Sequence, residues 1–178
     1  MVDDLFELSK VQAGALHLTM SRVTLADIVS DALATATPIA QAKGIRLRGR
    51  AEEGLPLEVD VGEVGRALCN LVVNAIRHTP SDGTIDITAG REAVGGEGRR
   101  AFVAVHDACG GIPPSDLERL FDVGFRGTSA RTPGPDGGAG LGLAIARGIV
   151  EAHRGEVKVA NEPERGGCRF TVMLPLAA

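Results

Sequence analysis

Apolar residues recur three or four positions apart in the first quarter of the chain, which is the spacing of amphipathic helices. One such stripe runs from Asp3 to about Gly14. A second begins at Thr24, which forms a capping pattern with Asp27 three residues later, and it ends at Gly44. The pattern therefore predicts two helices that are each closed by a glycine.

A third helix is predicted for the segment VGRALCNLVVNAIRHT, whose apolar residues keep helical spacing over several turns. Asp60 and Glu63 precede it as a second capping pair. We expect a short helix from Ser115 to Phe121 and another helix over LGLAIARGIVEAH. Between these two lies FRGTSARTPGPDGGAG, which is rich in Gly, Pro, Ser and Thr and has no periodicity, so it predicts a mobile loop.

Strand patterns fill the rest of the chain. The segments IRLRGR, GTIDITAG and RRAFVAVHD read as strands. We expect the last two to form an antiparallel pair in which Asp107 ends the second strand. GEVKVAN and GCRFTVMLP predict a final hairpin. Helices and strands alternate without a strict βαβ order. We therefore predict an α/β (α+β) two-layer sandwich, with a mixed, mostly antiparallel sheet covered on one face by helices.

Composition narrows the class of protein. The length of 178 residues and the 44% apolar content fit one domain with its own core and a short appendage. Without Trp or Tyr, and with a net charge of −4, the chain has no platform for stacking nucleic-acid bases. Three scattered cysteines predict no disulfide framework, and no apolar run is long enough to span a membrane. We expect a cytoplasmic chain that contacts neither nucleic acid nor membrane directly.

The third helix carries a group of polar residues on one face. Asn70 and Asn74 are four positions apart, and Arg77 and His78 follow one turn later. Amide oxygens are hard ligands of the kind that Mg²⁺ binds, and an Arg at this place suits a phosphate. The alternative is that both amides only bond neighbouring backbone groups.

Two glycine-containing segments add further candidates. In VAVHDACGGIPP, Asp107 precedes a tight Gly110-Gly111 turn, so its carboxylate is placed to accept from an adenine amino group, or simply to cap an ordinary turn. In GGAGLGLAIA, glycines lead into a helix and expose backbone amides at its positive end, which suits phosphate, although a glycine-rich helix start also serves plain packing.

The order of these segments resembles the catalytic domain of sensor histidine kinases. NLVVNAIRH is similar to the N box of that family, DACGGI to its first glycine box, LFDVGFRG to its F box and GGAGLGLAIA to its second glycine box. The resemblance covers residues 24–175. It implies a Bergerat ATP-binding fold with ATP under a lid over residues 113–138, preceded at residues 1–18 by the end of the second helix of the dimerisation hairpin.

The resemblance also implies roles for single residues. Asn74, assisted by Asn70, is expected to hold Mg²⁺, and Asp107 to bind the adenine amino group. Arg77 and Arg126 are expected to reach phosphates, so these two and the two asparagines form the expected catalytic set. Phe121 and Phe125 are expected to anchor the lid. The full expected nucleotide-binding set is Asn70, Asn74, Arg77, His78, Asp107, Gly111, Ile112, Phe121, Arg126, Gly127, Gly138, Gly140, Leu141, Gly142, Leu143 and Cys168.

Two residues depart from the family pattern. Cys109 stands where the first glycine box usually has its first glycine, and Cys168 where the family usually has a Thr that bonds the adenine-binding Asp through water. A thiol donates a weaker hydrogen bond than a hydroxyl. Because both changes flank the expected adenine site, we expect modest ATP affinity.

None of the four histidines has the setting of a phosphoacceptor, which in the family is a His followed by an acidic residue on an exposed helix. They are His17, His78, His106 and His153. The resemblance thus implies transfer of the γ-phosphoryl group to a histidine on another segment or chain, with a response regulator downstream. Half a hairpin does not make a four-helix dimer, so we expect a monomer. The alternatives are a related ATPase or anti-sigma serine kinase, and a degenerate nucleotide-binding scaffold.

Overall fold

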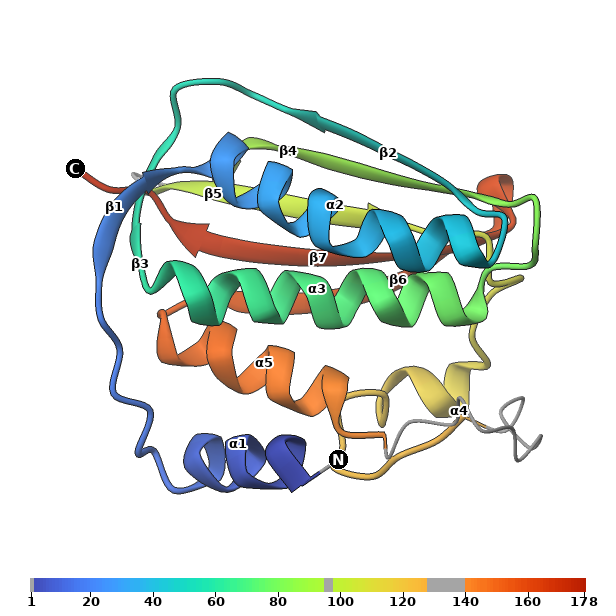
Figure 1. The fold of residues 1–178 in the computed structure, drawn as a ribbon, viewed down its shortest axis with the longest axis horizontal. Helices are drawn as coiled ribbons and strands as arrows, with labels where there is room; N and C mark the ends of the chain where they lie inside the picture. Colours follow the sequence, from blue (N-terminus) through green and yellow to red (C-terminus); the bar gives the residue numbers. More distant parts are fainter. Residues whose placement is uncertain (1, 95–97, 128–139) are drawn as a thin grey trace.

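A five-stranded mixed sheet forms one layer of the structure, a computed structural model that describes residues 2–94, 98–127 and 140–178 (Figure 1). The strand order is β2 (Arg46–Ala51), β4 (Thr84–Val94), β5 (Gly98–His106), β7 (Gly167–Pro175) and β6 (Glu156–Glu162). Only β2 and β4 are parallel, since α3 lies between them in the chain, and the other neighbours are antiparallel. The predicted mixed, mostly antiparallel sheet is confirmed.

Three helices cover one face of this sheet: α2 (Leu25–Ala42), α3 (Val61–His78) and α5 (Gly142–Ala152) (Figure 1). Alternate residues of the strands, such as Val103 and Val105 of β5, are buried against them. Large aliphatic side chains and Phe170 of β7 fill the layer between, and they form one continuous core. The predicted two-layer α/β sandwich is confirmed.

Both predicted capping pairs form at the starts of their helices. The backbone N–H of Asp27 donates to Thr24 Oγ1 at 3.2 Å, and that of Glu63 donates to Asp60 Oδ1 at 3.1 Å. The backbone N–H of Asp60 also donates to Nε2 of the buried His153 at 3.0 Å. Nδ1 of His153 lies 2.8 Å from the carbonyl of Ile149, so this ring links the end of α5 to the start of α3.

Two short strands were missing from the sequence prediction. β1 (Ser21–Thr24) pairs antiparallel with β3 (Pro56–Val59) in a separate two-stranded sheet. Four residues are too few to show alternation, and proline is unfavourable within a strand. The predicted helix from Ser115 to Phe121 was also too long. The helix α4 covers only Pro114–Leu117, and tight turns follow it, such as the bond from the N–H of Asp122 to the carbonyl of Arg119.

The helix α1 (Val2–Gln12) lies beside α5 at the edge of the helical layer (Figure 1). Gly148 of α5 permits this approach, because a Cβ atom at that position would overlap Val11. Arg66 of α3 forms an ion pair with Glu7 at 3.1 Å. The predicted leading helix is thus present and packed on the domain. Within the described residues, no helix combines the length and the apolar character needed to cross a membrane.

Candidate functional site

Three segments that are far apart in the sequence meet near the C-terminal half of α3. They are α3 itself, the loop after β5 and the beginning of α5. Nδ2 of Asn70 donates to the carbonyl oxygen of Gly142 at 3.2 Å, which joins α3 to the start of α5. The backbone N–H of Ala108 donates to Oγ1 of the buried Thr79 at 3.3 Å, which joins the loop after β5 to the end of α3.

Asn70 and Asn74 lie one turn apart on α3, and their environments differ. The amide group of Asn70 is engaged by Gly142, whereas the side chain of Asn74 makes no hydrogen bond with any described residue. Nδ2 of Asn70 thus bonds a backbone carbonyl 72 positions away, and Oδ1 of Asn70 has no hydrogen-bond partner among the described residues. A half-exposed carboxamide without a partner is free to bind a ligand.

Arg77 and His78 are exposed at the last turn of the same helix. Desolvation lowers the pKa of His78 below its ordinary value, and the positive charge of Arg77 lowers it further. His78 is therefore mainly uncharged at neutral pH. The cations at this end of the helix are Arg77 and Lys43, whose Nζ donates to the carbonyls of Ile76 and Arg77 at 2.8 and 2.6 Å.

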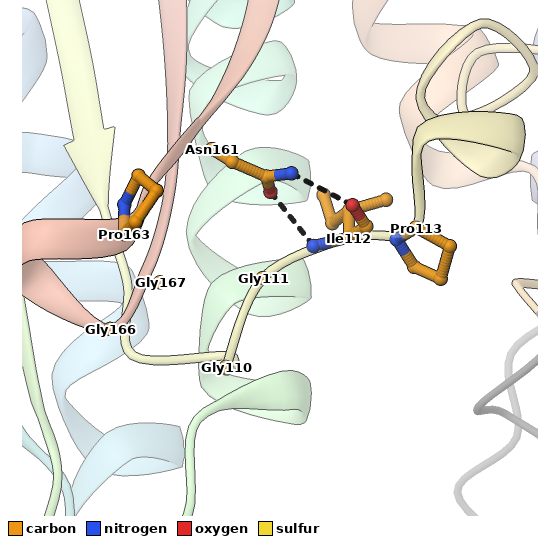
Figure 2. Close-up of a pocket in the computed structure, with 8 residues that line it drawn as sticks. All are labelled: Gly110, Gly111, Ile112, Pro113, Asn161, Pro163, Gly166 and Gly167. Atoms are coloured by element: carbon orange, nitrogen blue, oxygen red, sulfur yellow. Dashed lines mark hydrogen bonds between the residues drawn. The ribbon is translucent and has the colours of Figure 1, made fainter.

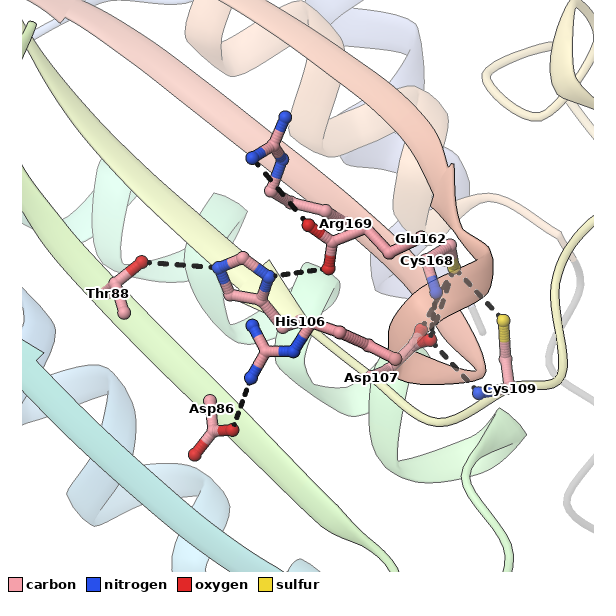
Figure 3. A network of polar contacts seen from close by, with 9 residues as sticks. Asp86, Thr88, His106, Asp107, Cys109, Glu162, Cys168 and Arg169 are labelled. Atoms are coloured by element: carbon pink, nitrogen blue, oxygen red, sulfur yellow. Dashed lines mark hydrogen bonds and ion pairs between the residues drawn. The ribbon is translucent and has the colours of Figure 1, made fainter.

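Asp107 is the buried carboxylate of the site, and it comes directly after β5 (Figure 3). Its Oδ1 accepts hydrogen bonds from the backbone N–H groups of Cys109 at 3.1 Å and Cys168 at 3.0 Å. The thiol of Cys168 lies 3.2 Å from Oδ1 and 3.3 Å from Oδ2. The carboxylate is thus held in one orientation by β7 and by its own loop. In the described residues, Oδ2 has only the weak thiol as a partner.

Two thiols surround this carboxylate. The sulfur atoms of Cys109 and Cys168 are 3.1 Å apart, and Cys168 is buried while Cys109 is half-buried (Figure 3). The hydrogen bond to Cys109, burial and the charge of Asp107 all raise the pKa of the Cys168 thiol, so this thiol is protonated in the ligand-free chain. Cys109 of the first glycine box and Cys168 of the last strand therefore meet at the predicted adenine-binding carboxylate.

The predicted tight turn after Asp107 is present. Gly110 and Gly111 adopt φ angles of 84° and 96°, which side chains with a Cβ atom avoid. Cys109 has no positive φ, so the departure from the family's first glycine does not strain the backbone. The turn tolerates a side chain at this position.

Asn161 of β6 holds the segment after this turn, and sequence reasoning missed it. Its Oδ1 accepts from the N–H of Ile112 and its Nδ2 donates to the carbonyl of Ile112, both at 2.8 Å (Figure 2). A groove of about 500 Å³ lies beside this contact. Of the expected nucleotide-binding residues, only Gly111 and Ile112 line it, so the groove is at most one side of the expected site.

The start of α5 is joined to the rest of the domain, and its first backbone N–H groups have no acceptor within the helix. Gly140 has a φ of 70°, and its carbonyl accepts from the N–H of Gly124 at 3.2 Å, which joins this turn to the F-box loop. Leu141 packs into the core. The first N–H groups of a helix have no acceptor within it, so those of Gly142 and Leu143 are available to an anion.

The expected lid is only partly within the described residues. Phe121 contacts Phe170 edge to face with ring centres 6.3 Å apart, and the guanidinium of Arg119 lies 4.7 Å from the ring centre of Phe125. Arg126 is exposed and Gly127 is half-buried. Gly138 lies outside the described residues, as do residues 128–139 of the mobile loop predicted over 125–140. The Phe121–Phe170 contact joins the beginning of the expected lid segment to β7, whereas the Arg119–Phe125 contact lies within that segment.

The histidine of the sequence HD is part of a separate network on the uncovered face of the sheet. Nδ1 of His106 lies 2.8 Å from Oε2 of Glu162, and its Nε2 lies 3.3 Å from Thr88 Oγ1 (Figure 3). This residue is on a strand, with both ring nitrogens engaged. The setting differs from an exposed helical nucleophile, as the sequence indicated.

A family model described as "Histidine kinase-, DNA gyrase B-, and HSP90-like ATPase" matches residues 59–178, which contain α3, Asp107 and α5. The chain belongs to this ATPase family. Among its relatives, the sensor-like histidine kinase SenX3 of Mycobacterium tuberculosis is 36% identical over 175 residues, which are 98% of this chain and 41% of that protein. The alginate biosynthesis sensor protein KinB of Pseudomonas aeruginosa is 31% identical over 99% of this chain and 28% of its own length. The chain spans less than half of these curated relatives.

Solved structures of histidine kinases share the ATPase-family fold. The crystal structure of full-length ShkA in complex with AMPPNP has a TM-score of 0.82 and 27% identity, and covers 99% of this chain and 35% of that one. The catalytic domain of the histidine kinase ThkA has a TM-score of 0.74 and 25% identity, and covers 88% of this chain and 95% of that one. The sensor histidine kinase resemblance found in the sequence is therefore confirmed.

Proposed function

We propose that this chain is the ATP-binding catalytic part of a two-component sensor histidine kinase. It binds Mg²⁺-ATP and transfers the γ-phosphoryl group to a histidine on another segment or chain, from which a response regulator receives it. Membership of the ATPase family and likeness to sensor kinases over nearly the whole chain support this function. The observation that carries it is the buried, oriented carboxylate of Asp107 beside the Gly110-Gly111 turn.

Recognition of adenine rests on Asp107. Its Oδ2 has only a weak thiol partner in the described residues, so it is the oxygen left to accept from the exocyclic amino group. Gly111 carries no side chain that would block the approach of the base, and Ile112 is fixed behind it by Asn161. An isosteric Asn at position 107 would present an NH₂ group or lose charge, and either change weakens this contact.

Residues of α3 and α5 bind the phosphates and the metal. The carboxamide oxygen of Asn74, which has no partner in the described residues, is a suitable ligand for Mg²⁺. Asn70 lies one turn away and is hydrogen-bonded to the carbonyl of Gly142. Bound Mg²⁺ neutralises charge on the transferred group. The amides of Gly140, Leu141, Gly142 and Leu143 face the phosphates, while Arg77 and Arg126 add positive charge. These groups act by positioning and charge, without forming a covalent bond to the chain.

The decisive experiment mixes the chain with radiolabelled ATP, Mg²⁺ and a separately produced dimerisation hairpin that carries its histidine. The proposal predicts an acid-labile label on the hairpin, lost in Asp107→Asn and Asn74→Ala. Asp86→Asn is the matched control, because this carboxylate pairs with Arg165 on the uncovered face of the sheet. An acid-stable label on serine would favour the serine-kinase alternative, and ATP binding without label would favour a degenerate scaffold.

A further inference from the structure

We propose that Asp107, Cys109 and Cys168 form a binding site for a thiophilic divalent cation such as Zn²⁺. The two sulfur atoms and a carboxylate oxygen all lie within 4.8 Å of one another. Occupancy of this site would block the adenine position, and this consequence rests on the proposed function of Asp107. The third cysteine, Cys69 on α3, is outside the cluster.

The cluster brings two sulfur atoms and a carboxylate close together, with few hydrogen-bond donors among them. The two backbone N–H groups that reach Asp107 both go to Oδ1. One further N–H group, that of Gly111, donates to Cys109 Sγ at 3.4 Å. Oδ2 and the two sulfur atoms otherwise share at most two thiol protons, and thiols are weak donors. The sulfur of Cys168 lies 3.1 Å from that of Cys109 and 3.2 and 3.3 Å from the two carboxylate oxygens of Asp107, so lone pairs of three side chains gather around it. A cation at their centre relieves this crowding.

The choice of metal follows from the ligands. Two thiolates and one carboxylate suit Zn²⁺, which binds sulfur at about 2.3 Å and oxygen at about 2.0–2.2 Å, whereas Mg²⁺ and Ca²⁺ prefer oxygen alone. No fourth His, Cys, Asp or Glu joins the group in the described residues. Water completes the coordination, as in zinc sites with three protein ligands.

The geometry needs only a small adjustment. Tetrahedral bonds of about 2.3 Å separate two sulfur atoms by about 3.8 Å, so the thiols must move apart by well under 1 Å. Cys109 is half-buried on a loop next to Gly110, which allows this movement. A disulfide would require the sulfur atoms to close to about 2.0 Å and would not use the carboxylate. The metal is favoured because it engages all three residues.

Binding is not a redox step. Each thiol gives its proton to the solvent as its sulfur binds the cation, so one Zn²⁺ replaces two protons and the carboxylate binds without losing any. The oxygen of Asp107 that would accept from adenine is then occupied by the metal. ATP and Zn²⁺ should therefore exclude each other.

The first test uses the full chain, reduced and free of nucleotide. Co²⁺ replaces Zn²⁺ as a spectroscopic probe, because a thiolate-to-cobalt charge-transfer band reports sulfur ligation directly. Zn²⁺ affinity is then measured by competition with a chromogenic chelator. We expect one metal per chain, and roughly 100-fold weaker binding in Cys109→Ser and in Cys168→Ser, since even second-shell changes cost 10–100-fold. Cys69→Ser should bind as the unchanged chain does.

The second test measures ATP affinity at free Zn²⁺ concentrations set by a metal buffer, because ATP itself binds zinc. At free Zn²⁺ tenfold above its dissociation constant, the apparent ATP dissociation constant should rise about tenfold, and Cys109→Ser should remove this effect. A missing cobalt band, equal binding in all cysteine variants, or a 109–168 disulfide formed in place of metal binding would overturn the proposal. A cobalt band in a chain that binds no ATP would instead refute the proposed function and leave the metal site standing.

Discussion

The sulfur of Cys168 lies 3.2 Å from Oδ1 and 3.3 Å from Oδ2 of Asp107, so the side chain that replaces the family's usual Thr contacts the expected adenine-binding carboxylate directly. The thiol is a weak donor and is protonated in the ligand-free chain. The carboxylate is therefore oriented, but less strongly than it would be by a hydroxyl.

Cys168→Thr should tighten ATP binding severalfold. A hydroxyl donates at about 2.7–2.8 Å and more strongly than a thiol, and a β-branched residue suits the strand β7. Isothermal calorimetry with ATP checks this prediction, and Cys69→Ser serves as the control. Nanomolar affinity in the unchanged chain, or weaker binding in the Thr variant, would contradict it.

Asn74→Ala should remove the Mg²⁺ dependence of ATP binding. The Asn74 carboxamide has no partner in the described residues, so its loss leaves the helix packing intact while it removes a metal ligand. Titration of ATP with Mg²⁺ and with a chelator should show at least about a tenfold gain from Mg²⁺ in the unchanged chain, which is about 1.4 kcal/mol, and little gain in the variant. Val73→Ala on the same helix is the matched control. An equal gain in both chains would exclude Asn74 as the ligand.

Asp60→Asn should flatten the loss of stability in acid. The hydrogen bond from the N–H of Thr19 lowers the pKa of Asp60 most, and the N–H of Glu63 lowers it further. The unfolded chain therefore takes up the proton first, so this stabilisation is complete above about pH 4 and is lost as pH falls through the folded pKa.

Asn is also a good N-cap, so the variant keeps most of its stability at neutral pH. Urea unfolding midpoints between pH 7 and pH 3 measure the effect, with Asp31→Asn on the exposed face of α2 as the control. A steep acid loss that persists unchanged in Asp60→Asn would count against the assignment.

Gly148→Ala should release α1 from α5, because the new Cβ atom would overlap Val11. Hydrogen exchange over residues 2–12 should rise, and the double variant Val11→Ala with Gly148→Ala should restore protection. Gly65→Ala is the control, since a Cβ atom there meets no atom within 4 Å and alanine favours a helix by about 1 kcal/mol. Unchanged exchange in Gly148→Ala would show that the close approach is not required.

The sequence predicted those parts of the molecule that follow from local patterns. The amphipathic stripe and the caps at Thr24 and Asp60 located α2 and α3, and the double glycine located the turn after Asp107. The order of the motifs then supplied the family. The short strands β1 and β3 were not predicted, because they are defined by their pairing with each other and not by a pattern within either one.

Long-range side-chain contacts were beyond the sequence for the same reason. Asn161 and Ile112 are 49 positions apart, and a single Asn at the end of a strand carries no signal of its partner. The meeting of Cys109 with Cys168 over 59 positions depends on the register of β5 and β7. Only the shared position of both cysteines in the family's adenine-site motifs pointed to their proximity.

Calorimetry in Mg²⁺ tests adenine recognition by Asp107 most directly, through the affinity of the chain for ATP and for GTP before and after Asp107→Asn. We predict that the unchanged chain prefers ATP, because adenine carries an amino group at C6 where guanine carries a carbonyl oxygen, which a carboxylate repels. Asp107→Asn should weaken ATP binding by at least about tenfold, or 1.4 kcal/mol, and abolish the preference. Asp86→Asn should bind as the unchanged chain does. ATP affinity and nucleotide preference that survive in Asp107→Asn would contradict adenine recognition by this carboxylate.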